Sequence, residues 1–467
     1  MAEAAVRSAQ PLEQVNVSND TGVQAEVAVA LDPTNDQVLL AGSNSIALSA
    51  LGSLARVYGS NDGGATWTSR PGPAAARLGD RRACDYGDPT VAIDRGGRQY
   101  YGFLAAACID FSKLETGEEL TIPSLEVATR AGAAGAWRSA RVFPSAGTRF
   151  DDKPAIAVDT SPASPYVDRV YVAWTRIRLR GPNSFQGARG DIVVSRSDDH
   201  GETWSRPVVV TDRQNLGSTF ASLAVDRTGR VYVAWTDAQH GIWIDSSDSG
   251  GDRFGRDVKV DAAVFLPGGH CSERGQVGVP AQSRRCITPT PAVSVDDRAG
   301  RGERIYVTYA AAGHDGREQD VFAAALDSQL RPLLAAPQQV NPPDTAAASD
   351  QFMPAAAVDP GSGRLWVCFY DTSGDRRRER VFYSCTASSD GGATWARPVR
   401  AATVPSKEAA RGGLALLSDF QFGDYQGLAV ANGVAHPIWT DTRDRDVLSE
   451  EIYTTVLTDA QLQSPQP

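Results

Sequence analysis

One long repeat limits the fold of this chain more than any other feature of its sequence. An apolar strand ends in an acidic residue, a tight turn follows, and an aromatic-rich strand comes next, as in Phe220–Asp226 and Arg230–Thr236. The acidic anchor recurs at intervals of 62 to 73 residues, at Asp32, Asp94, Asp159, Asp226, Asp296, Asp359 and, as an amide, Asn432. A four-stranded antiparallel sheet fits this interval, and radial repetition of such sheets forms a β-propeller. We therefore predict an all-β, seven-bladed β-propeller, with a six-bladed ring as the alternative.

The last repeat contains too few strands for a complete blade. If the strands of a blade are named A to D in chain order, the seventh repeat ends with strand C at Glu451–Val456. The segment Gln14–Ser18 resembles the D strand near Gln339–Asn341, so we expect it to complete the seventh blade and remove two exposed sheet edges. The predicted domain covers residues 11–458, and residues 1–10 and 459–467 are expected to be flexible tails.

A second, shorter repeat follows several C strands. Ser60–Trp67, Ser197–Trp204 and Ser388–Trp395 share the pattern Ser-x-Asp-x-Gly-x-Thr-Trp, and a weaker copy begins at Ser246 and ends at Phe254. The Asp can accept hydrogen bonds from turn amides, the Gly supplies a positive φ, and the Trp can pack between neighbouring sheets. This pattern predicts a stabilised turn between strands C and D, without a chemical role.

These turns resemble the Asp-box, the bacterial neuraminidase repeat of the sialidase superfamily. The resemblance implies an active site on the face of the ring opposite the boxes. It also implies a tyrosine nucleophile paired with a glutamate, an aspartate acid/base and three arginines that hold the substrate carboxylate. The Arg-Ile-Pro motif that carries the first arginine in sialidases is absent, because the first A strand reads Glu26-Val-Ala-Val-Ala30. We therefore assign no catalytic residue of this chain by matching it to a sialidase motif.

The residues just before the A strands and just after the B strands lie on the face opposite the boxes, which we call the mouth. We expect three catalytic residues there: Asp152 and Asp424 as acid/base, because crowded carboxylates can hold raised pKa values, and Tyr425 as nucleophile. Arg176 and Arg443 would bind a substrate carboxylate in bidentate fashion. The complete set of expected substrate-binding residues is Asp88, Arg176, Asp237, Asp371 and Arg443.

The six cysteines fall into three local couples. Their even number and the absence of a Cys-x-x-Cys pair favour disulfides over a metal or redox site. We predict Cys84–Cys108, Cys271–Cys286 and Cys368–Cys385, and hence an oxidising compartment, extracellular or periplasmic. The N-terminal residues contain no apolar stretch of the kind found in signal peptides, so we expect no signal peptide in this chain.

The formal net charge of −10 limits the classes of molecule that we expect this chain to bind. An acidic surface repels nucleic acid and anionic lipid, and no apolar run is long enough to span a membrane. We expect a monomer that binds a glycan or other carbohydrate, with no nucleic acid, no membrane insertion and no cofactor. A structural calcium ion remains an open alternative.

Three functions are compatible with these observations. The first is a secreted glycoside hydrolase of the sialidase superfamily that acts on extracellular glycans. The second is a polysaccharide lyase that acts on uronate polymers, and the third is a non-catalytic carbohydrate- or protein-binding propeller.

Overall fold

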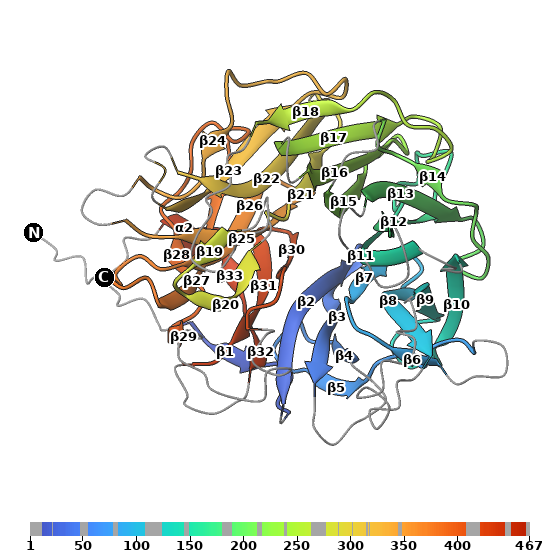
Figure 1. Cartoon of the computed structure of the whole chain (residues 1–467), viewed down its shortest axis with the longest axis horizontal. Helices are drawn as coiled ribbons and strands as arrows, with labels where there is room; N and C mark the ends of the chain where they lie inside the picture. The colour runs from blue at the N-terminus through green and yellow to red at the C-terminus, as the bar shows by residue number, and fades with distance from the viewer. Residues whose placement is uncertain are drawn as a thin grey trace, which may run out of the picture.

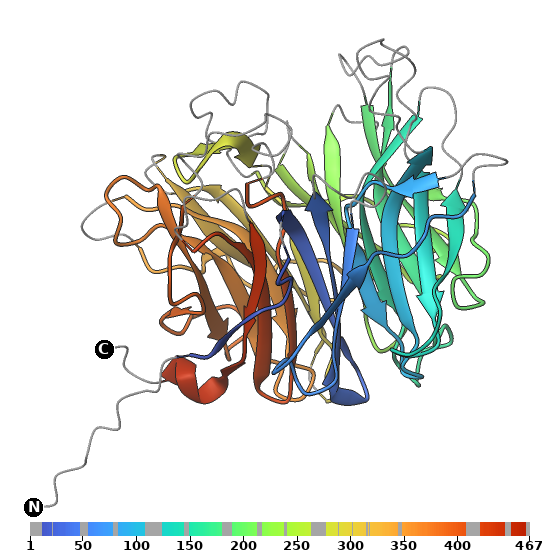
Figure 2. The same ribbon diagram turned by 90° about the horizontal axis from the view of Figure 1, so that it is seen from below.

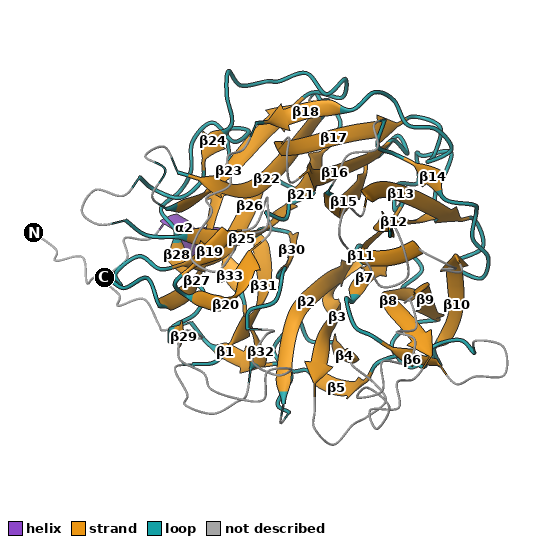
Figure 3. Cartoon of the chain, viewed as in Figure 1, coloured by secondary structure: helices purple, strands orange, loops and turns teal. Residues whose placement is uncertain are grey.

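Seven antiparallel sheets surround one central axis in the computed structural model (Figure 1). It describes residues 12–20, 22–46, 55–77, 83–107, 124–143, 149–179, 189–212, 217–237, 241–262, 277–287, 289–300, 302–313, 316, 318–343, 348–407, 421–443 and 450–463. Strands account for nearly all the regular structure of these residues (Figure 3). The predicted seven-bladed β-propeller is confirmed, and the six-bladed alternative is wrong.

The strands of the first four blades follow the order A to D from the axis outward, with four strands in blades 1, 3 and 4 and five in blade 2. Blade 1 is β2 (Val23–Asp32), β3 (Asn35–Ile46), β4 (Ala55–Ser60) and β5 (Thr68–Pro71). Blade 2 is β6 (Ala83–Asp85) and β7 (Thr90–Ile93), which share the A position, then β8 (Gln99–Ala107), β9 (Ser124–Arg130) and β10 (Arg138–Phe143). Blade 3 is β11 (Arg149–Val158), β12 (Val170–Arg178), β13 (Arg189–Ser197) and β14 (Val208–Val209). Blade 4 is β15 (Ser218–Val225), β16 (Val231–Asp237), β17 (Gly241–Ser247) and β18 (Val258–Asp261).

The remaining blades follow the same order, and a hairpin is inserted before the fifth. That hairpin is β19 (Val277–Val279) and β20 (Gln282–Ile287). Blade 5 is β21 (Ala292–Asp296), β22 (Arg304–Ala312), β23 (Gln319–Leu326) and β24 (Gln338–Gln339). Blade 6 is β25 (Gln351–Val358), β26 (Leu365–Asp371), β27 (Arg380–Ser388) and β28 (Val399–Arg400), with β29 (Ser406–Lys407) also paired to β27. Blade 7 is β30 (Gly427–Ala431), β31 (Val434–Asp441), β32 (Glu451–Thr455) and β1 (Gln14–Asn16), with β33 (Leu457–Thr458) paired to β31.

The N-terminal strand closes the ring as predicted. β1 pairs antiparallel with β32, with Gln14 opposite Thr455 and Asn16 opposite Tyr453. Val17 continues the contact, because its amide donates to the Ile452 carbonyl at 2.7 Å and its side chain is buried. At the other end, helix α2 (Asp459–Gln463) occupies residues that the sequence predicted to be part of a tail, and Leu462 within it is only 5% exposed. The packed structure therefore extends a few residues beyond the predicted boundary.

The repeated turns have one hydrogen-bond pattern, which explains their sequence. In the first turn, Ser60 Oγ accepts the Gly64 amide at 2.9 Å, and Asp62 Oδ1 accepts the Thr66 amide at 2.9 Å. The second and third complete turns repeat these bonds. In blade 4 the same pattern falls on Ser247, Ser249, Gly251 and Arg253. The predicted start of this weaker copy at Ser246 is therefore wrong by one residue, because Ser249, and not Asp248, takes the place of the turn aspartate.

One predicted disulfide lies wholly within the described residues and is confirmed. Cys368 and Cys385 face each other on β26 and β27 and are bonded. Cys84 is also disulfide-bonded, but Cys108 lies outside the described residues. Cys271 lies outside them as well, so the Cys84–Cys108 and Cys271–Cys286 pairings remain predictions.

Removing the closing strand tests the ring closure. A truncated chain that starts at Asn19 should lose at least about 3 kcal/mol of unfolding free energy, because it loses the β1–β32 pairing and the buried Val17. Urea denaturation would measure this change against a control chain that starts at Leu12 and keeps these contacts. Equal stability of the two chains would show that β1 does not hold the ring closed.

Candidate active site

The inner strands share a kink at one point of the repeat. Six residues before the anchor, five blades place a non-glycine residue with positive φ: Glu26 (58°), Asp88 (52°), Lys153 (51°), Phe220 (55°) and Met353 (50°). The pairing of strands A and B shifts register there in blades 1, 3, 4 and 6, as in a β-bulge, and blade 2 divides its A strand between β6 and β7. This conformation costs a non-glycine residue about 1 kcal/mol or more. The sequence therefore tolerates strain repeatedly at the axis.

Side chains from these kinks meet on the axis. Lys153 Nζ lies 2.8 Å from Asp424 Oδ2, 3.3 Å from Asp88 Oδ1 and 3.5 Å from Glu26 Oε1. These three carboxylates come from blades 1 and 2 and from the segment before blade 7. Glu26, Asp88 and Asp424 are only 1%, 6% and 7% exposed. One ammonium group thus organises three nearly buried carboxylates.

A second cation reaches the cluster from the inserted hairpin. Arg285, on β20, donates from Nη2 to Glu26 Oε1 at 2.8 Å and binds Asp424 through both Nε and Nη2. The hairpin lies at one end of the ring, and α2 lies at the other (Figure 2). Gln421 Oε1 fixes the hairpin by accepting the Arg285 amide at 2.9 Å. We call Glu26, Asp88, Lys153, Arg285 and Asp424 the central cluster.

The surroundings shift the pKa values of two carboxyls of the central cluster, Glu26 and Asp424, in opposite directions. Burial raises the pKa of Glu26 well above its usual value, and neighbouring Asp88 and Asp424 add to this rise against Lys153 and Arg285. Burial would also raise the pKa of Asp424, but Lys153 and Arg285 outweigh it and hold that pKa well below the usual range. Three carboxyls share two cations, so retaining one proton on Glu26 neutralises the cluster. Such a divergent pair can supply an acid and a base at the same pH.

The predicted site residues Asp88, Asp152, Asp424 and Tyr425 lie at this centre. Asp152 is partly buried, and its carboxylate helps to raise the pKa of Asp88, although burial is the larger cause. The Tyr425 hydroxyl donates to the Pro89 carbonyl at 3.1 Å. Burial, followed by the Asp88 and Glu26 carboxylates, raises the pKa of Tyr425 well above 10. These surroundings favour the neutral phenol, so the nucleophile assignment remains a prediction without support from the geometry.

Three of the other predicted binding residues contact side chains of their own blades, and Arg176 also contacts Phe143 of blade 2. Arg176 pairs with Asp151 at 3.0 Å and lies over the Phe143 ring. Asp371 accepts the Gln351 side-chain amide at 2.9 Å, and Arg443 lies 3.6 Å from the centre of the Tyr453 ring. Asp237 ends β16 and is fully buried. The structure does not bring these four residues into the central cluster, and their binding role remains a prediction.

Three members of the central cluster were not assigned a role from the sequence. Glu26 and Lys153 lie six residues before an anchor, as Asp88 does, so the repeat itself contains the signal that aligns them. Arg285 lies in an insertion between repeats, where the blade pattern provides no position for it. Its role follows only from the way the β19–β20 hairpin packs on the ring.

A cavity of about 260 Å³ continues along the axis on the inner side of the cluster. Lys153 and Tyr425 line its mouth end, and the walls are A-strand residues such as Val27, Ala155 and Leu223. The three carboxyl residues of the central cluster, Glu26, Asp88 and Asp424, do not line this cavity. The cavity therefore touches the central cluster through Lys153 and is otherwise lined mainly by residues of the inner strands.

Comparisons with known proteins give only weak similarity. No family model matches the sequence, and no curated protein matches it. Solved structures that align with the chain include a protein of unknown function from Dyadobacter fermentans, with 14% identity, a TM-score of 0.48 and coverage of 77% of this chain and 93% of that one. The α-L-arabinofuranosidase of Fusarium graminearum aligns with 11% identity, a TM-score of 0.48 and coverage of 97% and 99%. Trypanosoma rangeli sialidase aligns with 13% identity, a TM-score of 0.43 and coverage of 79% and 55%.

The class of the protein therefore follows from its own strand pairing and contacts. It is a seven-bladed β-propeller with a buried charged cluster where its inner strands converge. Among the described residues, no three His, Cys, Asp or Glu side chains are arranged to hold a metal ion. The helix that the structure describes is too short to cross a membrane.

Replacing Lys153 tests the electrostatics of the cluster. The Lys153→Met variant should lose about 3–5 kcal/mol of unfolding free energy at pH 8, because buried carboxylates lose their shared cation. The loss should be smaller at pH 4.5, where protonation removes part of the repulsion. Denaturant titrations at both pH values measure it, with Lys259→Met on the outer strand β18 as the control. A loss independent of pH would contradict the ion-pair account.

Proposed function

We propose that the chain is a carbohydrate-active propeller, a glycoside hydrolase that uses the central cluster at its mouth. This proposal rests on two nearly buried carboxyls, Glu26 and Asp424, that share Lys153 and Arg285 as neighbours. These surroundings raise the pKa of Glu26 and lower the pKa of Asp424. Hydrolysis of a glycosidic bond commonly uses one protonated and one ionised carboxyl. Repeated backbone strain at the same place supports a functional role.

In this proposal the two carboxyls have distinct roles. Glu26, whose pKa is raised, donates a proton to the leaving oxygen of the glycosidic bond. Asp424, held ionised by Lys153 and Arg285, either attacks the anomeric carbon as the nucleophile or takes a proton from the water that attacks this carbon. Tyr425 and Asp152 border this pair and contribute to substrate positioning.

The charge of the cluster favours a sugar without a carboxylate. Sialidases hold their substrate carboxylate with three arginines, whereas this cluster contains one arginine that already binds Glu26 and Asp424. With Glu26 protonated the cluster is neutral and its one arginine is already paired, so it offers no net positive charge to bind the carboxylate of a sialic or uronic acid. We therefore propose a neutral glycan as the substrate.

Substrate access requires a movement of the β19–β20 hairpin. Arg285 covers two of the carboxyls, and all three carboxyls are nearly buried. In the proposed reaction a sugar enters from the mouth and replaces Arg285 as the partner of Glu26. A binding propeller without catalysis is the second candidate, because the existing ion pairs already satisfy much of the cluster.

The lyase alternative has less support. A lyase needs a base and an arginine-rich site for a uronate, and His436 and His200 lie at the Asp-box side of the ring. His240, His270 and His314 are outside the described residues. A monomer in an extracellular or periplasmic compartment remains our proposal, and the Cys368–Cys385 disulfide supports an oxidising location.

The test is a hydrolysis screen with neutral glycans, sialosides and uronate polymers, followed by variants assayed on the substrate found. Glu26→Gln and Asp424→Asn should each lower kcat/KM by about 10²-fold or more, with the fold retained. Glu379→Gln, a mouth-side carboxylate paired with Lys407, is the control and should keep wild-type kcat/KM.

The screen also separates the alternatives. Cleavage of uronate polymers with an unsaturated product would favour the lyase, and binding without turnover would favour the binding module. Wild-type turnover in both Glu26→Gln and Asp424→Asn would refute the assignment of these two residues.

A further inference from the structure

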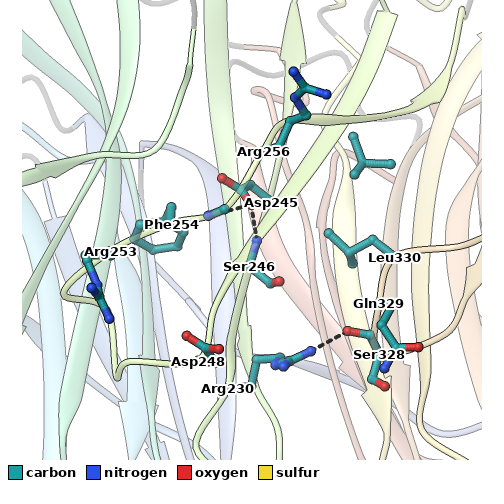
Figure 4. A pocket seen from close by; sticks show the side chains of 12 residues that line it. Arg230, Asp245, Ser246, Asp248, Arg253, Phe254, Arg256, Ser328, Gln329 and Leu330 are labelled. Atoms are coloured by element: carbon teal, nitrogen blue, oxygen red, sulfur yellow. Dashed lines mark hydrogen bonds between the residues drawn. The ribbon is translucent and has the colours of Figure 1, made fainter.

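A second cavity, of about 500 Å³, lies on the Asp-box side of the ring between blades 4 and 5. Arg230 borders it from the turn between strands A and B of blade 4. Residues of the C–D turns of both blades complete the wall, including Arg256, Gln329 and Leu330 (Figure 4). This cavity is at the end of the ring opposite the mouth, so it is separate from the central cluster.

The sequence of blade 5 explains why space remains here. In blades 3 and 6, the turn tryptophans Trp204 and Trp395 pack on the core of the preceding blade. Blade 5 instead connects β23 to β24 through a short turn at Asp327–Arg331, and Leu330 packs against blade 4. A leucine fills less volume than a tryptophan, so the junction of blades 4 and 5 keeps a hollow.

The floor of this cavity carries a buried acid with an unused oxygen. Asp245 is 1% exposed, and its Oδ1 accepts the Ser246 and Gly255 amides at 2.6 and 3.1 Å. Its Oδ2 has no hydrogen-bond partner among the described residues. The equivalent positions in blades 3 and 6 hold hydroxyls, Ser195 and Thr386, which donate to a carbonyl of their own turn. A carboxyl is therefore not needed here to form the blade.

The electrostatic surroundings of Asp245 favour a ligand that donates a hydrogen bond. Burial, with the nearby Asp257 and Asp212 carboxylates, raises the pKa of Asp245 to about 7. Near neutral pH an ionised Asp245 would leave Oδ2 buried and unsatisfied, which is unfavourable. A ligand hydroxyl placed in the cavity would satisfy this oxygen.

Arginines supply the complementary charge. Arg253 and Arg256 are exposed and make no ion pair with any described residue, and Arg230 donates across the blades to the Ser328 carbonyl. Arg256 and Arg230 lie on either side of Asp245, with Leu330 across from it (Figure 4). Exposed Asp248 is the other acid of the lining, so the residues that line the cavity include three arginines and two acids. A guanidinium binds a carboxylate in bidentate geometry.

We propose that this cavity is a non-catalytic saccharide site for a sugar unit with a carboxylate, in which Asp245 Oδ2 accepts a sugar hydroxyl and Arg256 holds the carboxylate. Leu330, Phe254 and Val258 provide apolar surface for the ring of the sugar. A cavity with apolar walls and a few convergent polar groups is the usual form of a small-ligand site. The proposal is independent of hydrolysis at the mouth, and the two sites prefer sugars of different charge.

Calorimetric titration with D-glucuronate tests the proposal, with D-glucose as the neutral probe and acetate as the anion alone. D-glucuronate should bind saturably and at least about tenfold more tightly than either of the other probes. Asp245→Ser introduces the residue type that blade 3 has at the equivalent position, Ser195. Arg256→Gln removes the guanidinium group. Each should weaken D-glucuronate binding by at least about tenfold, the change expected from losing one charge-assisted hydrogen bond.

A matched variant and a mouth variant distinguish this site from other binding. Arg206 occupies in blade 3 the position of Arg256, two residues after the turn aromatic, so Arg206→Gln should bind D-glucuronate as the wild type does. Binding should also persist in Glu26→Gln, which separates the result from the proposed function. Thermal unfolding of Asp245→Ser at pH 8 should show a melting temperature at or above that of the wild type. Absence of saturable binding, equal affinity for D-glucose, or unchanged affinity in both cavity variants would overturn the proposal.

Discussion

Convergence of seven inner strands on one axis is the constraint on which the rest of this structure depends. Each blade brings the same point of its A strand to the centre, so these side chains must fill that space together. In blades 1 to 3 the chain places Glu26, Asp88 and Lys153 there, each with positive φ. Buried charges are stable only when they are paired. The carboxyls of the central cluster therefore need Lys153 and Arg285 as partners of opposite charge. The ring geometry thus turns a repeated kink into one asymmetric polar centre.

The central cluster links the stability of the ring to its proposed chemistry. Asp424 and Arg285 join the segment before blade 7 to an inserted hairpin, and Lys153 joins blade 3 to blades 1 and 2. The same contacts give Glu26 and Asp424 opposite tendencies to hold a proton. A site of this kind gains reactivity because the fold has already removed water from its charged groups. The roles proposed for Glu26 and Asp424 are performed by the carboxyl groups themselves.

The sequence contains most of the architecture because the turn chemistry repeats. The anchor Asp226, for example, accepts the Thr228 and Arg230 amides at 2.8 and 3.0 Å, which explains why Asp recurs at the end of the A strands. The same logic predicted ring closure through Gln14–Ser18 and the Cys368–Cys385 bond, because both follow from strand order. The weaker turn of blade 4 was misaligned by one residue because Asp248 lies next to Ser249, and only the hydrogen bonds identify which of the two takes the turn position.

The candidate site could be predicted only in part. Position before an A strand predicted that Asp88, Asp152, Asp424 and Tyr425 lie at the mouth, and the structure places these residues at the centre, while their roles remain predictions. Position after a B strand did not bring Arg176 or Arg443 to the centre. The Arg176 guanidinium packs on Trp174 of its own blade and on Phe143 of blade 2, and the Arg443 guanidinium packs on Tyr453. Arg285 belongs to an insertion with no periodic counterpart, so its contact with Glu26 depends on tertiary packing alone.

Measuring the protonation state of Glu26 tests most directly whether this residue can act as the proton donor. The protein labelled with ¹³C at glutamate carboxyls can be titrated by NMR, and the Glu26→Gln variant identifies the resonance of interest. This resonance should titrate well above the ordinary glutamate pKa of about 4.3, because burial and neighbouring carboxylates favour the neutral acid. Titration at or below that value would show that Glu26 is ionised in the ring, and would contradict its role as the proton donor.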